Sequence, residues 1–167
     1  MALLEVLHFP DPRLRNKARP VTRVDHRIRE LAANMLETMY AAPGIGLAAI
    51  QVDVPLRVVT IDISSDHNEP LILVNPEIIA STGSIRTEEG CLSVPETYEL
   101  VERAEWIRYK ALDLDGQAQE REANDMLAVC VQHEIDHLNG RLFVDYLSQL
   151  KRQRIRKKLT RQQRLAS

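Results

Sequence analysis

Residues 131–140 read VQHEIDHLNG and contain the pattern H-E-x-x-H, formed by His133, Glu134 and His137. On an α-helix, residues four apart lie on the same face, so both imidazoles can bind one metal ion. Glu134 lies about 100° further round the helix, where it can contact a water beside the metal but is poorly placed to bind the ion. The stretch therefore predicts a hydrolytic metal centre on a helix. The alternative is a surface helix that carries two histidines by chance.

A third ligand is needed, and the sequence after the helix does not supply one. One class of zinc peptidase has a further histidine ten residues after the first, a position occupied here by Phe143. Another class adds a glutamate downstream, but Asp145 is the only acidic residue after Asp136. A third ligand must therefore come from upstream, where the candidates, besides the carboxylates, are His8, His26, His67, Cys91 and Cys130.

The two cysteines differ in their suitability as ligands. Cys130 and His137 are separated by about 10.5 Å of helix rise, whereas ligand atoms lie within about 2.0–2.3 Å of a zinc ion. Cys130 therefore cannot bind together with both histidines, and we expect it to pack beside the site. Cys91 follows Gly90, where the backbone can approach a partner closely, and a thiolate is a strong ligand. Cys91 is the leading upstream candidate, with a buried structural cysteine as the alternative.

Composition is typical of one globular domain. The chain has 167 residues, of which 44% are hydrophobic and 28% charged. It has no run of 18 apolar residues, so we expect no membrane span. The start, MALLEVLHFPDPRL, lacks the basic and apolar regions of a secretory signal. We therefore expect a cytoplasmic protein whose two cysteines form no disulfide.

Charge is distributed unevenly along the chain. Residues 150–167 contain eight Lys or Arg and no Asp or Glu, whereas the rest has 14 basic and 24 acidic residues. A basic C-terminal segment on an otherwise acidic chain predicts that this segment binds a polyanion.

The order of elements predicts an α+β fold. Apolar residues at helical spacing predict a helix over residues 28–39, capped by Asp25 and ended by Pro43. Residues 44–51 are expected to form a loop. Asp125 is expected to cap the metal-binding helix and Gly140 to close it. Alternating and β-branched runs predict strands at 57–63, 71–74, 98–101, 106–114 and 119–122.

Two of the predicted boundaries depend on particular residues. Asn75-Pro76 is expected to end the second strand, and Ser148 to begin a last helix. We thus predict mixed or antiparallel strands around a central metal-binding helix, with an N-terminal helix and an appended C-terminal helix. Residues 1–147 would form the catalytic domain and residues 148–167 a basic helical tail.

Three motifs together resemble the signatures of the peptide deformylase family. They are GIGLAAIQ at 44–51, EGCLS at 89–93 and QHEIDHLNG at 132–140. The resemblance runs from VLHFPDPRL at 6–14 to the tail, and is to the bacterial type with a C-terminal helix. It implies that Cys91, His133 and His137 bind the metal and that Glu134 is the general acid/base.

The resemblance also implies roles around the metal. The Gln51 amide and the Leu92 N–H would bind the formyl oxygen, and Gly46 would contact the substrate backbone. Arg103 matches an arginine near the substrate. The methionine side chain would be surrounded by Ile45, which also contacts the substrate backbone, and by Met126, Val129, Cys130 and His133.

The sequence departs from the family pattern at two positions. Ile50 stands where threonine is frequent, and Thr87 stands where an apolar pocket residue is usual. The second departure could alter the rim of the side-chain pocket.

The implied activity is hydrolysis of the formyl group from the formyl-methionine end of nascent polypeptides. One divalent metal per monomeric chain is expected, with Fe²⁺ physiological and Zn²⁺, Ni²⁺ or Co²⁺ as substitutes. The basic tail suggests ribosome docking. The alternatives are a zinc endopeptidase, or a ribosome- or nucleic-acid-binding module whose structural metal would need a fourth protein ligand.

Overall fold

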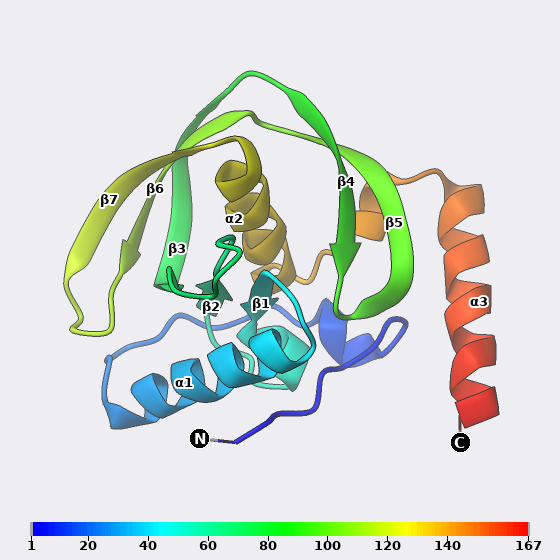
Figure 1. Ribbon diagram of the computed structural model, residues 1–167, viewed down its shortest axis with the longest axis horizontal. Helices are drawn as coiled ribbons and strands as arrows, with labels where there is room; N and C mark the ends of the chain where they lie inside the picture. The colour runs from blue at the N-terminus through cyan, green and yellow to red at the C-terminus, as the bar shows by residue number, and fades with distance from the viewer. Residues whose placement is uncertain (1, 167) are drawn as a thin grey trace.

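The computed structural model describes residues 2–166 (Figure 1). Three α-helices, seven strands and three short 3₁₀ helices follow one another within these residues. In chain order they are η1 (Pro12–Arg15), α1 (His26–Ala41), β1 (Gly46–Ala48), η2 (Ala49–Val52), β2 (Val58–Ile61), β3 (Leu71–Thr82), β4 (Ile85–Cys91), β5 (Val94–Arg103), β6 (Trp106–Leu112), β7 (Ala118–Asn124), α2 (Asp125–Leu138), η3 (Phe143–Tyr146) and α3 (Gln149–Ala166).

The labelled strands of residues 2–166 form two sheets whose ladders are antiparallel. One sheet has the order β1-β2-β3-β6-β7, and the other is the β4–β5 hairpin. Helix α2 lies between the two sheets, and α3 lies outside β5 (Figure 1). The predicted α+β architecture with a central helix is confirmed.

Helix α1 forms where its apolar spacing predicts. The Asp25 side chain accepts hydrogen bonds from the backbone N–H groups of Arg27 and Ile28, which caps the N-terminus. The helix ends at Ala41, just before Pro43. Its inward face packs against β1 and β2 through the buried residues Ile28, Met35 and Met39.

Strand β3 corrects the prediction that Asn75-Pro76 ends a strand. The strand continues to Thr82 through a register shift between Val74 and Glu77. Asn75 has φ 53°, a left-handed conformation that asparagine tolerates better than most residues. Its side chain also exchanges two hydrogen bonds with the backbone of Val21, at 2.8 and 2.9 Å. A β-bulge therefore absorbs the proline, which cannot donate to the ladder.

Strand β4 was not predicted, and β5 begins four residues earlier than predicted. The inward-facing positions of β4 include Thr87 and Glu89, so the strand lacks an alternating apolar pattern. Cys91 is consequently the last residue of a strand.

Helix α2 begins one residue earlier than the predicted cap implies, because Asn124 rather than Asp125 occupies the N-cap position. Gly140 closes the helix, as predicted. Gly140 has φ 76°, its N–H bonds to the His137 carbonyl and the next N–H bonds to the Asp136 carbonyl. This is a Schellman motif, which favours glycine at that position. Buried apolar residues of the helix, among them Ala128, Val131 and Leu138, pack in one cluster with those of the large sheet.

Helix α3 starts after Ser148, as predicted, and the Ser148 hydroxyl accepts from the Lys151 N–H at 3.2 Å. Ile155 and Leu159 are buried in a cluster that includes Phe9 and Phe143.

Residues 1 and 167 of the predicted domains lie outside the described part of the chain. Among the described helices, none combines the length and apolar character of a membrane span.

Asp62, which follows β2, provides a prediction about acid stability. Its carboxylate is 2% exposed and accepts from the Tyr40 hydroxyl at 2.6 Å, the Ser64 hydroxyl and N–H, and the Glu69 N–H. Burial alone would raise the pKa, but these hydrogen bonds outweigh it and lower the pKa of Asp62 from 3.8 to about 2. The carboxylate therefore stabilises the fold above pH 3.8, and this contribution disappears as the pH falls toward 2.

We expect Asp62→Asn to lower the free energy of unfolding by about 1.5–3 kcal/mol at neutral pH. The difference from wild type should shrink between pH 4 and pH 2, as measured by urea unfolding across that range. Asp66→Asn, at a nearby exposed position, is the matched control. A difference that stays constant with pH would contradict the assignment.

Candidate metal centre

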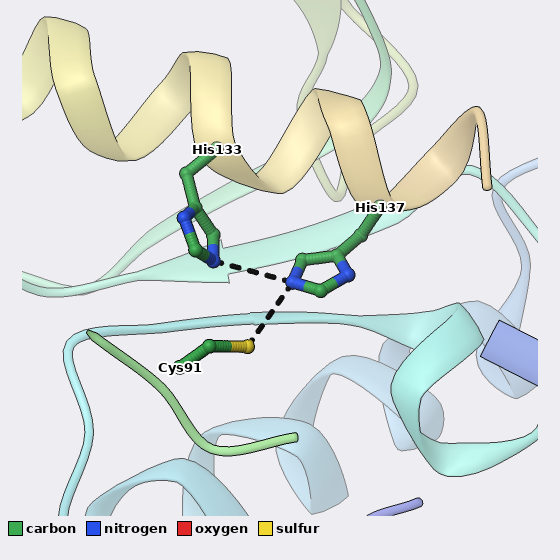
Figure 2. Close-up of side chains that lie close together, drawn as sticks. All are labelled: Cys91, His133 and His137. Atoms are coloured by element: carbon green, nitrogen blue, oxygen red, sulfur yellow. Dashed lines mark hydrogen bonds between the residues drawn. The ribbon is translucent and has the colours of Figure 1, made fainter. Parts of the chain in front are cut away.

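Three potential ligands converge between α2 and the end of β4 (Figure 2). The two Nε2 atoms of His133 and His137 are 3.2 Å apart, and Cys91 Sγ is 3.3 Å from His137 Nε2. All three ligand atoms lie within 4.8 Å of one another. The structure therefore brings the upstream cysteine to the two helical histidines, as the sequence predicts.

These spacings fit one tetrahedral ion. Two nitrogens held about 2.0–2.1 Å from a zinc-sized ion in tetrahedral geometry would be roughly 3.3 Å apart. His133 Nδ1 lies 2.8 Å from Glu89 Oε1, so it is the nitrogen that donates to the carboxylate. The lone pair of Nε2 is then free for a metal, as in carboxylate–histidine–metal arrangements. The donor set of one sulfur and two nitrogens suits a divalent transition metal.

A buried ion-pair network supports His133 from behind. Glu89 accepts from Arg103 Nε at 2.6 Å and Nη2 at 2.9 Å, and Arg103 Nη1 reaches Asp136 at 2.7 Å. The Tyr146 hydroxyl donates to the same Asp136 oxygen at 2.7 Å. Burial would raise the pKa of Glu89, but its hydrogen bonds to Arg103 and His133 lower it. Glu89 therefore stays ionised and fixes the orientation of the His133 ring.

Their surroundings shift the pKa values of the two imidazoles in opposite directions. Burial lowers the pKa of both, but the interactions of His133 with Cys91, Glu134 and Glu89 outweigh it and raise the His133 pKa well above 6.5. Burial and the positive charges of His133 and Arg103 lower the pKa of His137. Because a metal requires neutral imidazoles, metal binding would compete with protonation of His133.

Glu134 projects from α2 toward β1. The residue is 4% exposed, and its Oε1 has no hydrogen-bond partner among the described residues. A Cβ added at Gly46 would lie 2.3 Å from Glu134 Oε2, so only glycine leaves room for the carboxylate. Burial is the main cause that raises the pKa of Glu134 from 4.5 to about 7. A carboxylate with this pKa can accept and return protons near neutrality.

Gln51 is 1% exposed and lies beside Cys91. Its Oε1 accepts from the Ala48 N–H at 2.9 Å, and its Nε2 donates to Ser93 Oγ at 2.9 Å and to Cys91 Sγ at 3.5 Å. The sequence before it, expected to be a loop, forms β1 and the 3₁₀ helix η2, which carries Gln51. These short elements hold the amide next to the ligand sulfur.

A cavity of about 850 Å³ opens onto the centre. Most of the predicted site residues line it: Ile45, Gly46, Cys91, Leu92, Met126, Val129, Cys130, His133 and Glu134. Burial raises the pKa of Cys130 to about 12, so its thiol stays neutral.

Two of the expected substrate contacts, Gln51 and Arg103, are not among the residues that line the cavity. The Arg103 side chain is only 4% exposed. Its guanidinium is occupied by Glu89 and Asp136. These ion pairs hold the cation behind His133, near the site but away from the cavity wall.

Sequence reasoning missed the supporting roles of Glu89, Asp136 and Tyr146. Glu89 lies two residues before Cys91, so the two share one strand face; recognising β4 would have identified it. Asp136 lies within the H-E-x-x-H pattern, but nothing in the local sequence indicates its partner Arg103.

The geometry removes the basis of both alternative functions. The third ligand comes from upstream, unlike the downstream ligands of the zinc endopeptidases considered above. Among residues 2–166, the cluster of potential ligands contains Cys91, His133 and His137 and no fourth His, Cys, Asp or Glu. A structural site normally closes the fourth position with protein, so this site is of the open, catalytic kind.

Comparison with known proteins agrees with the site. The family model described as polypeptide deformylase matches residues 3–153. The chain is 60% identical to a peptide deformylase of Nitrosococcus oceani over 100% of both chains, and 58% identical to one of Pseudomonas aeruginosa over 98% of both.

Solved structures give the same result. A Legionella pneumophila peptide deformylase superposes with a TM-score of 0.93 at 49% identity, covering 98% of this chain and 97% of that one. The Ehrlichia chaffeensis enzyme in complex with actinonin gives a TM-score of 0.95 at 37% identity, covering 98% and 99%. From its motifs, its fold and its Cys/His/His centre, this chain belongs to the polypeptide deformylase family.

Proposed function

We propose that this protein hydrolyses the formyl group from the N-terminal formyl-methionine of nascent polypeptides and releases formate. The observation that carries the proposal is the convergence of Cys91, His133 and His137 beside the buried carboxylate of Glu134, at the wall of a cavity of about 850 Å³. Membership of the deformylase family supports the same reaction.

The chain's own residues account for the proton transfers. Glu134 accepts a proton from the attacking water as the water oxygen bonds to the formyl carbon. It then delivers that proton to the amine nitrogen as the carbon–nitrogen bond breaks, and formate and a free N-terminus leave. The Gln51 Nε2 atom lies 3.5 Å from Cys91 Sγ, and Leu92 is the next residue after Cys91. We propose that the Gln51 amide and the Leu92 backbone N–H donate to the formyl oxygen as its negative charge develops.

Cys91, His133 and His137 would hold one divalent metal. When bound there, the metal acts as a Lewis acid that polarises the formyl carbonyl and makes water more acidic. The ligand set accepts several metals, and we propose Fe²⁺ as the physiological one, with Zn²⁺, Ni²⁺ or Co²⁺ as substitutes. Metal analysis after anaerobic and aerobic purification, with activity measured in parallel, tests this. Equal activity with zinc and no iron in the anaerobic preparation would contradict it.

The cavity wall supports a substrate with an apolar first side chain. Ile45, Met126, Val129 and Cys130 provide apolar or sulfur surface next to His133. The backbone at Gly46 lies against Glu134. Together with the backbone of Ile45, it would position the peptide chain.

Formate release from a formyl-methionyl tripeptide is the direct test. We expect formate and one new amine per turnover, loss of activity after a chelator removes the metal, and recovery on readdition. An internal peptide bond in a longer formylated substrate should remain intact, as followed by mass spectrometry. Internal cleavage without formate release would contradict the proposal.

We further propose that residues 1–147 form the catalytic body and that α3 docks on the ribosome. Ile155 and Leu159 anchor α3 to the body, and Lys151 Nζ bonds to Glu99 at 3.1 Å. The opposite side of the helix carries an exposed basic stripe that would attract ribosomal RNA phosphates. The stripe consists of Arg154, Lys157, Arg161 and Arg164.

Charge reversal of this stripe tests the docking. We expect Arg154→Glu, Lys157→Glu and Arg161→Glu together to weaken ribosome co-sedimentation at low salt, while hydrolysis of a formylated tripeptide continues. This variant keeps Ile155 and Leu159 buried, which a truncation would not. Changing Glu30, exposed on α1, to Lys is a control for surface charge in general. Unchanged co-sedimentation of the triple variant would exclude the stripe as the docking surface.

A cytoplasmic monomer is the form that we propose to carry out this function. Nascent chains begin in the cytoplasm, and the metal ligands, Glu134 and the cavity wall all come from one chain. Size-exclusion chromatography with light scattering should give a mass near 19.1 kDa.

A further inference from the structure

A second basic surface lies around the start of helix α1. Residues 13–29 contain seven Lys or Arg and one acidic residue, whereas the other residues before 150 contain seven basic and 23 acidic residues. Arg13 is paired with Asp11 and Asp53, and Arg15 with Asp145. The five remaining cations are exposed, and their side chains form no ion pair with a carboxylate of residues 2–166. These cations form the α1 basic surface: Lys17, Arg19, Arg23, Arg27 and Arg29.

The segment before α1 is fixed to the body of the protein. Ala18 and Val21 are buried. The Ala18 N–H bonds to the Leu138 carbonyl at 2.9 Å, and the Val21 N–H bonds to Asn75 Oδ1 at 2.8 Å. The backbone is therefore held by its buried residues, while the long cationic side chains between them extend into solvent.

The first turn of α1 carries charge of the unfavourable sign. The N-terminal end of a helix has a partial positive charge, so acidic residues are favourable there and basic residues unfavourable. The first turn of α1 has no acidic residue and carries Arg27 and Arg29. The carboxylate of Asp25, just before it, accepts from the N–H groups of Arg27 and Ile28. The arginines and the helix dipole therefore add to one positive potential, which an anionic partner would offset.

The α1 basic surface is separate from the substrate cavity, because none of its residues lines that cavity. Helix α1 has 16 residues and is about 24 Å long. The cavity contacts Ala42, which follows the other end of the helix. The start of α1 lies at the left of Figure 1 and α3 at the right. A partner of this surface could therefore bind while a peptide occupies the cavity.

We propose that the α1 basic surface binds the phosphate backbone of RNA, independently of α3. Exposed cations without carboxylate partners can each replace a counterion at a phosphate, which gives affinity without sequence preference. Four of the five are arginines, whose guanidinium can donate to two phosphate oxygens at once. This inference goes beyond the proposed function and requires neither metal nor substrate.

The apolar residues favour RNA over an anionic membrane as the partner. Helices that lie on membranes combine cations with exposed apolar side chains that insert between the lipids. Within residues 13–29, no large apolar side chain is exposed. The surface thus offers positive charge alone, as expected for a contact with phosphates on a nucleic acid.

The test measures RNA binding in full-length chains by fluorescence anisotropy with a fluorescein-labelled RNA hairpin. The parent chain lacks three cations of the α3 stripe, so that α3 does not mask the second surface: Arg154→Gln, Lys157→Gln and Arg161→Gln. The test variant also lacks three cations of the α1 basic surface: Arg23→Gln, Arg27→Gln and Arg29→Gln. We expect its affinity at low salt to fall about tenfold or more. The slope of log affinity against log salt should become shallower by about 2–3, as for three phosphate contacts.

Arg86→Gln, Lys110→Gln and Arg121→Gln, made in the same parent, are the matched control. They remove the same charge from exposed positions on β4, β6 and β7, and should leave RNA affinity near that of the parent. Thermal unfolding separates binding from folding. Loss of Arg27 and Arg29 from the first turn should leave Tm unchanged or raise it, because both oppose the helix dipole.

Three results would overturn the proposal. The first is equal RNA affinity of the test variant and its parent, and the second is an equal loss in the control. The third is a parent that no longer binds the hairpin although the wild type does, which would leave α3 as the contact. Binding to phosphatidylglycerol vesicles but not to the hairpin would assign the surface to a membrane instead. Failure of the wild type to release formate would contradict the proposed function without affecting this inference.

Discussion

Glu134→Ala should retain the metal and lose nearly all formate release. A positioned general acid/base typically accelerates a reaction by about 10²–10⁴-fold, so we expect a decrease in kcat of at least that order. The ligand atoms come from Cys91, His133 and His137, none of which is changed, so metal content should stay near one per chain. Formate release and metal analysis on the same preparation measure both quantities.

Two further variants test whether the loss of activity is due to the Glu134 carboxylate. Glu134→Gln keeps the side-chain volume next to Gly46 and should be as inactive as the alanine variant, because an amide cannot accept the proton. Glu30→Ala, at an exposed position of helix α1, should retain wild-type activity. Deformylation at the wild-type rate by Glu134→Gln would remove Glu134 from the mechanism.

Glu89→Gln should lower both metal affinity and stability, although Glu89 is not a ligand. The carboxylate holds His133 Nδ1 at 2.8 Å and compensates the buried Arg103. Loss of such support behind a metal ligand typically weakens metal binding by about 10–100-fold. Removing one partner of a buried ion pair costs about 3–5 kcal/mol, with Asp136 as the remaining partner of Arg103.

Competition with a chromophoric zinc chelator measures the first effect, and denaturant unfolding of the metal-free protein measures the second. Glu88→Gln is the matched control for both measurements, because Glu88 is the preceding residue of β4 and its side chain is exposed on the opposite face. Equal zinc affinity in the Glu89 and Glu88 variants would show that the hydrogen bond to His133 does not support the metal.

The centre itself could be predicted from the sequence because its constraints are local. His133 and His137 are placed by helix geometry alone, and the exclusion of Cys130 follows from helix rise. Cys91 could be ranked first by its chemistry and its glycine neighbour, but its approach to the helix depends on how the β4–β5 hairpin packs. Arg103 shows the limit: sequence similarity located it near the site, whereas only the structure shows that Glu89 and Asp136 hold it behind His133.

The helices and strands could be predicted where apolar residues recur at regular spacing. They were harder to predict where polar residues of the site or long-range hydrogen bonds interrupt that spacing. Helix α1 and the Gly140 terminus of α2 follow from caps and spacing. Strand β4 has no apolar alternation because its inward face carries Thr87 and Glu89, which line the cavity. Strand β3 passes through Pro76 because Asn75 adopts a left-handed conformation and bonds to Val21, a partner 54 residues away that no local window contains.

The separation of the two sheets has a mechanical consequence. Within residues 2–166, the β4–β5 hairpin pairs with no strand of the larger sheet, yet it carries the sulfur ligand while α2 carries both imidazoles. An ion bound by all three is therefore a cross-link between two layers that backbone pairing leaves independent. Metal binding should therefore reduce the opening of the hairpin. The fraction of protein that holds the metal would then control how readily proteases cleave β4 and how fast its backbone amides exchange with solvent.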